Sequence, residues 1–167
     1  MKIKVQLVAN LAANGQLILA EQSAAYEAPA EISGMGTIKA MECGNVIMGA
    51  VTYKMFAPVM KEIFSKLEVV VLTSKGIGEG VHSAKTPEEA VSYLASKGFE
   101  TVCVLGGAKT YNSFMAAGLA DELFFNFFPV VIGGGGSLET VPGKVLNYKL
   151  AEAKAKGDVA VLHFVKS

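Results

Sequence analysis

The fold of this chain is decided by the stretch Val102-Cys-Val-Leu-Gly-Gly-Ala-Lys-Thr-Tyr111. Its apolar half is typical of a buried strand, and Gly106 and Gly107 then allow backbone angles that a side chain forbids. Beyond them, apolar residues recur at helical spacing, at Tyr111, Phe114, Met115 and Leu119. The stretch predicts a strand, a tight turn and a helix N-terminus, which together suit a phosphate group.

A second explanation of the two glycines stays open, because turning a strand into a helix needs no ligand. The third glycine of the Rossmann fingerprint is missing here, and no Gly-x4-Gly-Lys-Ser/Thr motif occurs in the sequence. The rest of the chain therefore has to decide between an architectural turn and a binding turn.

Composition narrows the class of protein. With 167 residues and 51% hydrophobic content, we expect one domain covering residues 1–167. Fifteen basic residues, all lysine, balance fifteen acidic ones, which argues against a nucleic-acid partner. There is no signal-peptide core and no apolar run near the roughly 18 residues that span a bilayer. We expect a cytoplasmic protein with no membrane partner, in which Cys43 and Cys103 are buried and reduced.

Apolar runs and breakers predict an α/β fold. Thr86 is expected to cap a helix, with Pro87 at its first position and Glu89 closing a capping box. The order predicts a mainly parallel sheet with an antiparallel C-terminal hairpin, in three α/β/α layers. Strands are expected at about 2–9, 45–49, 68–73, 81–82, 101–105 and 121–132, and as a pair within 145–166. Helices are expected at about 30–42, from 50 with a break at Pro58, at 86–98 and at 107–118.

Three stretches carry a family resemblance. They are Val46-Ile-Met-Gly-Ala-Val-Thr-Tyr53, Val70-Val-Leu-Thr-Ser-Lys75, and a C-terminal block made of Leu105-Gly-Gly-Ala-Lys-Thr-Tyr-Asn-Ser-Phe114, Ala117-Gly-Leu-Ala-Asp-Glu-Leu123 and Pro129-Val-Val-Ile-Gly-Gly-Gly135. Together they resemble the dihydrofolate reductase-like superfamily, and in particular the pyrimidine reductase domain of riboflavin biosynthesis.

That resemblance implies an NADPH site built from strand-to-helix turns. Gly106, Gly107 and the amides of Ala108, Lys109 and Thr110 would receive the pyrophosphate, and Gly49 and Thr52 would contact it from the other side. Ser74 and Lys75 would meet the adenosine 2′-phosphate, for which a hydroxyl and a cation are suited. Ala9, Gly15, Leu17 and Ile18 would lie along the nicotinamide.

The implied reaction is hydride transfer from NADPH to a carbon–nitrogen double bond of a small heterocyclic or imine-like substrate. Such a transfer needs a proton at nitrogen. Glu31 resembles the single active-site acid of dihydrofolate reductases, and we expect a buried carboxyl group there. Glu31 also fits a helix-initiating glutamate favoured by the helix dipole.

Two features leave a second function open. Ala50 stands where the family usually carries an arginine. The first loop, around Asn14-Gly15, departs from the family's Ser-Leu-Asp-Gly signature. A catalytically inactive nucleotide-binding or scaffold homologue is the alternative. The aromatic strand around Phe124–Phe128 could pair across a homodimer, and residues 133–136 could border the site or form only a flexible loop. His82 and His163, the latter expected at an edge or facing outward, receive no catalytic role.

Overall fold

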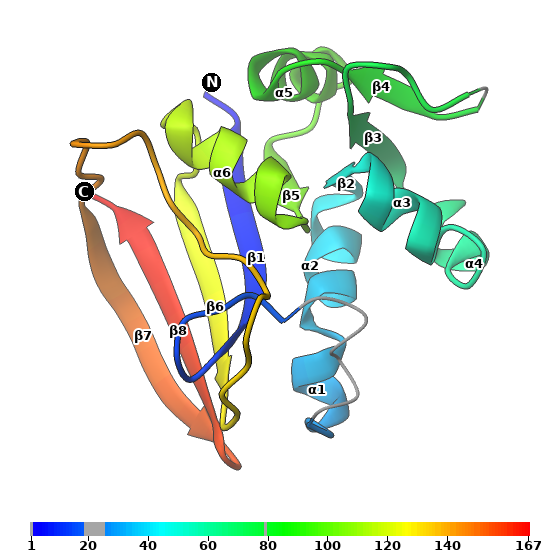
Figure 1. Ribbon diagram of the computed structural model, residues 1–167. Coiled ribbons are helices and arrows are strands. Elements are labelled where there is room, and N and C mark those ends of the chain that lie inside the picture. Colours follow the sequence, from blue (N-terminus) through cyan, green and yellow to red (C-terminus); the bar gives the residue numbers. More distant parts are fainter. Residues whose placement is uncertain (1, 19–25, 79) are drawn as a thin grey trace.

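The computed structural model describes residues 2–18, 26–78 and 80–167. An eight-stranded sheet runs through the molecule in the order β4-β3-β2-β5-β1-β6-β8-β7 (Figure 1). The strands from β4 to β6 are parallel, and β8 and β7 are added antiparallel to β6. The expected α/β class, with a mainly parallel sheet and an antiparallel C-terminal hairpin, is confirmed.

The strands are β1 (Lys4–Ala12), β2 (Asn45–Gly49), β3 (Glu68–Leu72), β4 (His82–Ala84), β5 (Thr101–Val104), β6 (Glu122–Phe128), β7 (Tyr148–Lys156) and β8 (Val159–Lys166). The helices are α1 (Ala30–Ser33), α2 (Met35–Cys43), α3 (Ala50–Phe56), α4 (Lys61–Phe64), α5 (Pro87–Ser96) and α6 (Ala108–Ala116).

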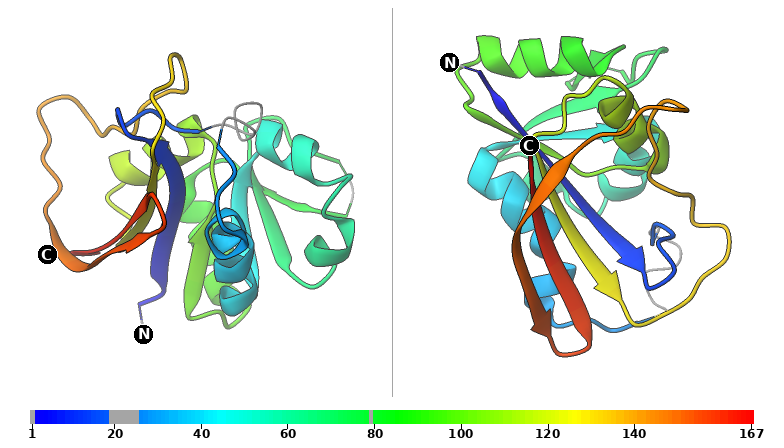
Figure 2. Two further views of the ribbon diagram at one scale, coloured as in Figure 1. Left: turned by 90° about the horizontal axis from the view of Figure 1, so that it is seen from below. Right: turned by 90° about the vertical axis from the view of Figure 1, so that its left-hand side faces the viewer.

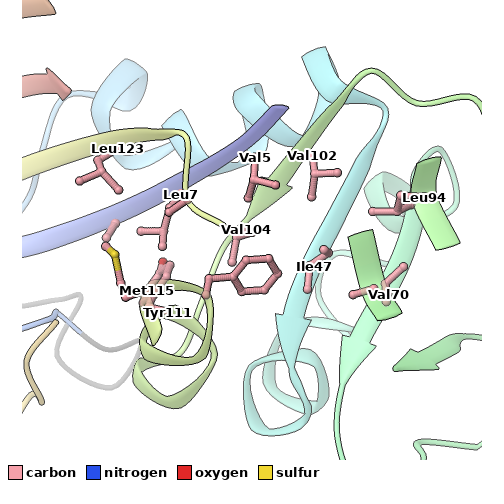
Figure 3. Close-up of a cluster of buried hydrophobic side chains, with 14 of the residues drawn as sticks. Val5, Leu7, Ile47, Val70, Leu94, Val102, Val104, Tyr111, Met115 and Leu123 are labelled. Carbon is pink, nitrogen blue, oxygen red and sulfur yellow. The ribbon is translucent and has the colours of Figure 1, made fainter. Parts of the chain in front are cut away.

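Two apolar layers hold the helices on the sheet. On one face, α5 and α6 cover alternate residues of the central strands, including Leu7, Ile47 and Val104 (Figure 3). Phe114 of α6 is completely buried in the same cluster. On the other face, α2 packs on Val8, Val46 and Cys103, among others. Successive side chains of β1, β2 and β5 point to opposite faces and so contribute to both apolar layers. This is expected for a parallel sheet buried on both sides (Figure 2).

Several boundaries differ from the prediction, four of them by more than one or two residues or by a break. The helix expected at 30–42 is divided at Gly34 into α1 and α2. Strand β1 continues to Ala12, because its last residues pair with β6 up to Phe128. The strand expected to reach residue 132 ends at Phe128, because Pro129 has no N–H group for a ladder. The hairpin starts at Tyr148 and not near residue 145.

The cap of α5 forms largely as predicted. The Thr86 hydroxyl accepts a hydrogen bond from the Glu89 amide at 3.2 Å, and Pro87 is the first helical residue. The Glu89 carboxylate accepts from the Lys85 amide at 2.8 Å, one residue before the partner that a capping box would give it. Cys43 and Cys103 are buried free thiols, and burial raises the pKa of both. None of the described helices has the length and apolar character needed to cross a lipid bilayer.

Candidate functional site

The candidate site lies at the carboxyl ends of the parallel strands, where β5 separates β1 from β2. Chain connections leave this point in both directions, and such a switch point is where open α/β sheets form their ligand crevice. The two turns that meet here are joined directly, since the Gly49 amide donates to the Gly106 carbonyl at 2.8 Å. The turn after β2 and the turn after β5 therefore form one backbone surface.

Packing requires glycine at two positions of this surface. A Cβ atom on Gly106 would lie 2.8 Å from the ring of Tyr111, and the residue has φ +108°. A Cβ atom on Gly49 would lie 2.8 Å from the hydroxyl oxygen of Thr110. The Tyr111 hydroxyl in turn donates to the carbonyl of Val8, which ties the first turn of α6 to β1. Gly106 and Gly49 are thus explained by architecture.

Gly107, which is joined to Gly106 by a cis peptide bond, is not explained by packing. Its φ is −71°, and an added Cβ would make only an ordinary contact, 3.5 Å from the Thr52 hydroxyl. It is the N-cap residue of α6, where serine, threonine, asparagine or aspartate would normally cap the first N–H groups. Within the described part of the chain no side chain caps α6, and its first turn holds no acidic residue. An uncapped helix N-terminus of this kind suits an anion.

The structure brings most of the predicted cofactor residues to this surface. Thr52 of α3 faces Gly107, and the buried Thr110 lies against Gly49. Ala108 and Lys109 open α6, with Lys109 exposed. Ser74 and Lys75 follow β3, the neighbour of β2; both are exposed, and the Lys75 amide donates to the Thr73 hydroxyl at 3.3 Å.

The first loop reaches the same place through the glycine loop at 133–136. The Leu17 amide donates to the Gly136 carbonyl at 2.8 Å, and a Cβ on Gly135 would lie only 2.0 Å from the Leu17 carbonyl oxygen. A Cβ on Gly136 would lie 3.4 Å from the Ala108 side chain. Residues 133–136 therefore lie between the first loop and the start of α6, and they border the candidate site.

Other predicted residues lie elsewhere. Ala9 is buried in the core layer under α6, and Gly15 is in the turn after β1, with open space around it. Ile18 packs with Phe128 on the opposite face. Glu31 is not the buried acid that we expected: its side chain is 61% exposed and lies 3.7 Å from the Lys156 ammonium. Ile32, and not Glu31, is the α1 residue buried against the sheet.

Sequence reasoning missed a buried amide beside the first loop. Asn126 of β6 is completely buried; its Nδ2 donates to Asn10 Oδ1 at 3.0 Å and to the Met35 sulfur at 3.4 Å. Its Oδ1 has no hydrogen-bond partner among the residues that the structure describes. Leaving such an oxygen unpaired costs about 1–3 kcal/mol. The available signal was one polar residue inside the apolar run 123–128.

A charged cluster occupies the other end of the same strand. Glu122 is buried and accepts from Lys4 at 3.0 Å, while His163 Nε2 lies 2.6 Å from its second oxygen. Burial opposes ionisation of Glu122, but the hydrogen bonds from Lys4 and His163 outweigh it and lower its pKa. His163 is not at an edge, because β8 lies between β6 and β7, and its ring stacks on Phe124 with centroids 4.1 Å apart.

Comparisons with known proteins agree with this architecture. A riboflavin biosynthesis protein RibD from Bacillus amyloliquefaciens is 50% identical over 46 residues, which are 28% of this chain and 12% of that protein. A putative riboflavin biosynthesis protein from Shewanella sp. PV-4 superposes with a TM-score of 0.74 at 17% identity, covering 99% of both chains.

Two further solved structures share the fold. A pyrimidine reductase-like protein from Corynebacterium diphtheriae gives a TM-score of 0.75 at 11% identity, covering 99% of this chain and 92% of the other. A diaminohydroxyphosphoribosylaminopyrimidine deaminase/5-amino-6-(5-phosphoribosylamino)uracil reductase from Thermotoga maritima gives 0.74 at 15% identity, and this chain spans 57% of it. The family model for the RibD C-terminal domain matches residues 43–162. The chain therefore belongs to the RibD C-terminal domain family.

Proposed function

We propose that this protein is an NADPH-dependent reductase that transfers a hydride to a carbon–nitrogen double bond of a small heterocyclic substrate of the pyrimidine type. The observation that carries the proposal is the uncapped N-terminus of α6 behind Gly107, which no packing requirement of the protein explains. Membership of the RibD C-terminal domain family supports the same reaction class.

The residues present fit a dinucleotide. Gly107 and the first amides of α6, at Ala108, Lys109 and Thr110, would hold the pyrophosphate. Gly49 would let the backbone approach from β2, with Thr52 beside it, because a side chain at position 49 would meet Thr110. Ser74 and Lys75 would distinguish NADPH from NADH through the 2′-phosphate. When bound, NADPH supplies the hydride; the protein orients it and excludes water.

Proton supply is assigned to Glu31 as a proposal. Its carboxylate is exposed to solvent and lies 3.7 Å from the Lys156 ammonium. We expect Glu31→Gln to lower kcat while leaving NADPH affinity unchanged. Unchanged turnover would restrict Glu31 to the ion pair and to the start of α1.

Calorimetric titration with NADPH and NADH tests the cofactor assignment. We expect micromolar binding of NADPH, weaker binding of NADH, and a smaller difference in Lys75→Ala. Lys149→Ala, which changes an exposed lysine of β7 far along the sheet, is the matched control. Absence of NADPH binding would overturn the proposal, and a preference for NADH would overturn the roles of Ser74 and Lys75.

NADPH oxidation with pyrimidines, pteridines and flavins then tests the substrate class. Binding of NADPH without turnover of any of them would favour an inactive nucleotide-binding homologue, the outcome that Ala50 would predict, because it offers no guanidinium to the cofactor phosphates. A cytoplasmic location and a homodimer are also part of the proposal. Both edges of β6 are occupied by β1 and β8, so such a dimer must use another surface than pairing of this strand.

A further inference from the structure

We infer that Asn126 recognises the substrate, by exchanging two hydrogen bonds with the lactam edge of a heterocyclic ring, where an N–H group stands beside a C=O group. The inference rests on the proposed reductase function for its setting, and it adds the residue and the chemical group that select the substrate. It starts from the unpaired Oδ1 atom of a completely buried amide.

The surroundings of Asn126 make a purely structural role a poor explanation. It pairs with Asn10 of β1 on one side and with Val161 of β8 on the other. Its neighbours on the same face of β6 are Phe124 and Phe128. An apolar residue would fit this face and would bury no polar atom. The amide therefore has a desolvation cost, which only a hydrogen-bond partner for its oxygen offsets.

The hydrogen-bond inventory of Asn126 has one good partner, one weak partner and one vacancy. Nδ2 donates to Asn10 Oδ1 at 3.0 Å, and its second hydrogen meets the Met35 thioether at 3.4 Å, a weak acceptor. A lactam supplies what is lacking: its N–H would donate to Oδ1, and its carbonyl would replace the sulfur as acceptor. Pyrimidinones carry this edge.

Access to the amide depends on Met35, which lies between Gly34 and Gly36 where α1 gives way to α2. Its unbranched side chain can turn aside without a change in the backbone. The start of α2 is fixed independently, because a Cβ on Gly36 would lie 3.1 Å from the Leu105 side chain. Movement of this thioether would free the Nδ2 hydrogen that it now accepts for another acceptor.

The Asn126 amide is also connected to the proposed cofactor surface through the first loop. Asn10 accepts a hydrogen bond from the Ile18 amide at 3.0 Å through its backbone carbonyl, and Leu17 bonds to Gly136, which lies against Ala108 at the start of α6. The first loop thus links the Asn10–Asn126 pair to the α6 N-terminus. A ring held by Asn126 would stand beside this loop, whose residues Leu17 and Ile18 the family resemblance places along the nicotinamide.

A matched pair of probes tests the inference on the intact protein with NADPH present. 6-Aminouracil carries the lactam edge, and 6-amino-1,3-dimethyluracil has both ring N–H groups methylated. We expect 6-aminouracil to shift the side-chain NH₂ resonances of Asn126 in ¹H–¹⁵N spectra, identified by their loss in Asn126→Leu. We expect the dimethyl analogue to bind at least about tenfold more weakly, because a site built for an N–H donor rejects a ligand without one.

Variants separate recognition from folding. Asn126→Leu should lose 6-aminouracil binding and keep NADPH binding, and Met35→Ala should bind the probe at least as tightly as the wild type. Met41→Ala, which removes an exposed methionine of α2, is the control and should change neither. If Asn126→Leu does not fold, the two probes on the wild-type protein still decide.

Three results would each overturn the inference. They are equal binding of the two probes, equal binding of 6-aminouracil by Asn126→Leu and wild type, and no binding of 6-aminouracil up to its solubility limit. Any of them would leave a buried water as the partner of Oδ1. The proposed function fails separately. Loss of NADPH binding with Asn126-dependent 6-aminouracil binding removes the reductase and keeps this site. Turnover of a different substrate without 6-aminouracil binding would keep the reductase function and remove this recognition site.

Discussion

The two halves of the sheet position their polar groups by different means. In the parallel half, the turns after β2 and β5 approach backbone to backbone, and Gly49 and Gly106 leave no room for side chains. In the other half, where β6 joins the parallel strands to the antiparallel hairpin, side chains position the charges: Glu122 is held between Lys4 and His163. Backbone N–H groups do not titrate, whereas carboxylates do. The difference teaches that binding at the α6 end should be insensitive to pH while the stability of the other half should not be.

The largest effect is expected at the two-glycine turn. Gly106→Ala combines a positive φ with a 2.8 Å approach to the Tyr111 ring, and we expect it to lower the free energy of unfolding by about 3–5 kcal/mol. Gly78→Ala is a matched control, since Gly78 has φ +106° but, apart from its chain neighbours, no atom of the described residues lies within 4 Å of the added Cβ. Chemical denaturation of both isolates the packing contribution. Equal losses would mean that the contact with Tyr111 is unimportant.

The contact between the two turns gives the next effect. Gly49 has an ordinary φ of −75°, so Gly49→Ala suffers only from the approach to Thr110, and we expect a loss of about 1–3 kcal/mol. Thr110→Ala removes the opposing hydroxyl. In a double-mutant cycle the combined variant should lose less stability than the sum of the two single variants. Strict additivity would contradict the direct contact.

The charged cluster of Lys4, Glu122 and His163, where β6 meets the antiparallel hairpin, should respond to acid. The pKa of Glu122 is lowered from 4.5 in the folded protein, so its contribution to stability is complete above that value and is lost as the pH falls through the folded-state pKa. Glu122→Gln should cost about 1–2 kcal/mol at neutral pH and flatten the loss of stability below pH 4.5. Urea denaturation across pH measures both. An unchanged slope would show that the Lys4 and His163 contacts contribute little.

The smallest effect is expected at the ion pair between α1 and β7. Glu31 is largely exposed and Lys156 is partly exposed, and Glu31→Gln should change the free energy of unfolding by less than about 0.5 kcal/mol. Thermal denaturation of this variant therefore serves as the control for its expected effect on turnover. A large loss of stability would assign Glu31 a structural role instead.

The local sequence pattern predicted the parallel strands and their turns well, because each strand-to-helix turn is determined by residues adjacent in the sequence. Gly106, Gly107 and the helix that follows them are an example. The exposure of Glu31 could not be predicted in this way. It depends on Ile32 taking the buried position of α1 and on Lys156 arriving from the C-terminal hairpin. The vacancy at Asn126 likewise exists only once β6 lies beside Asn10 and under Met35.

The bond from the Tyr111 hydroxyl to the Val8 carbonyl has a consequence for the energetics of binding. It anchors α6 to the central strand before any ligand arrives, so the amides beyond Gly107 are already oriented. An anion that docks there does not have to order a loop, and little conformational entropy is lost on association. The α6 end is thus a preorganised receptor, whose affinity should depend on the ligand's charge and shape and little on rearrangement of the chain.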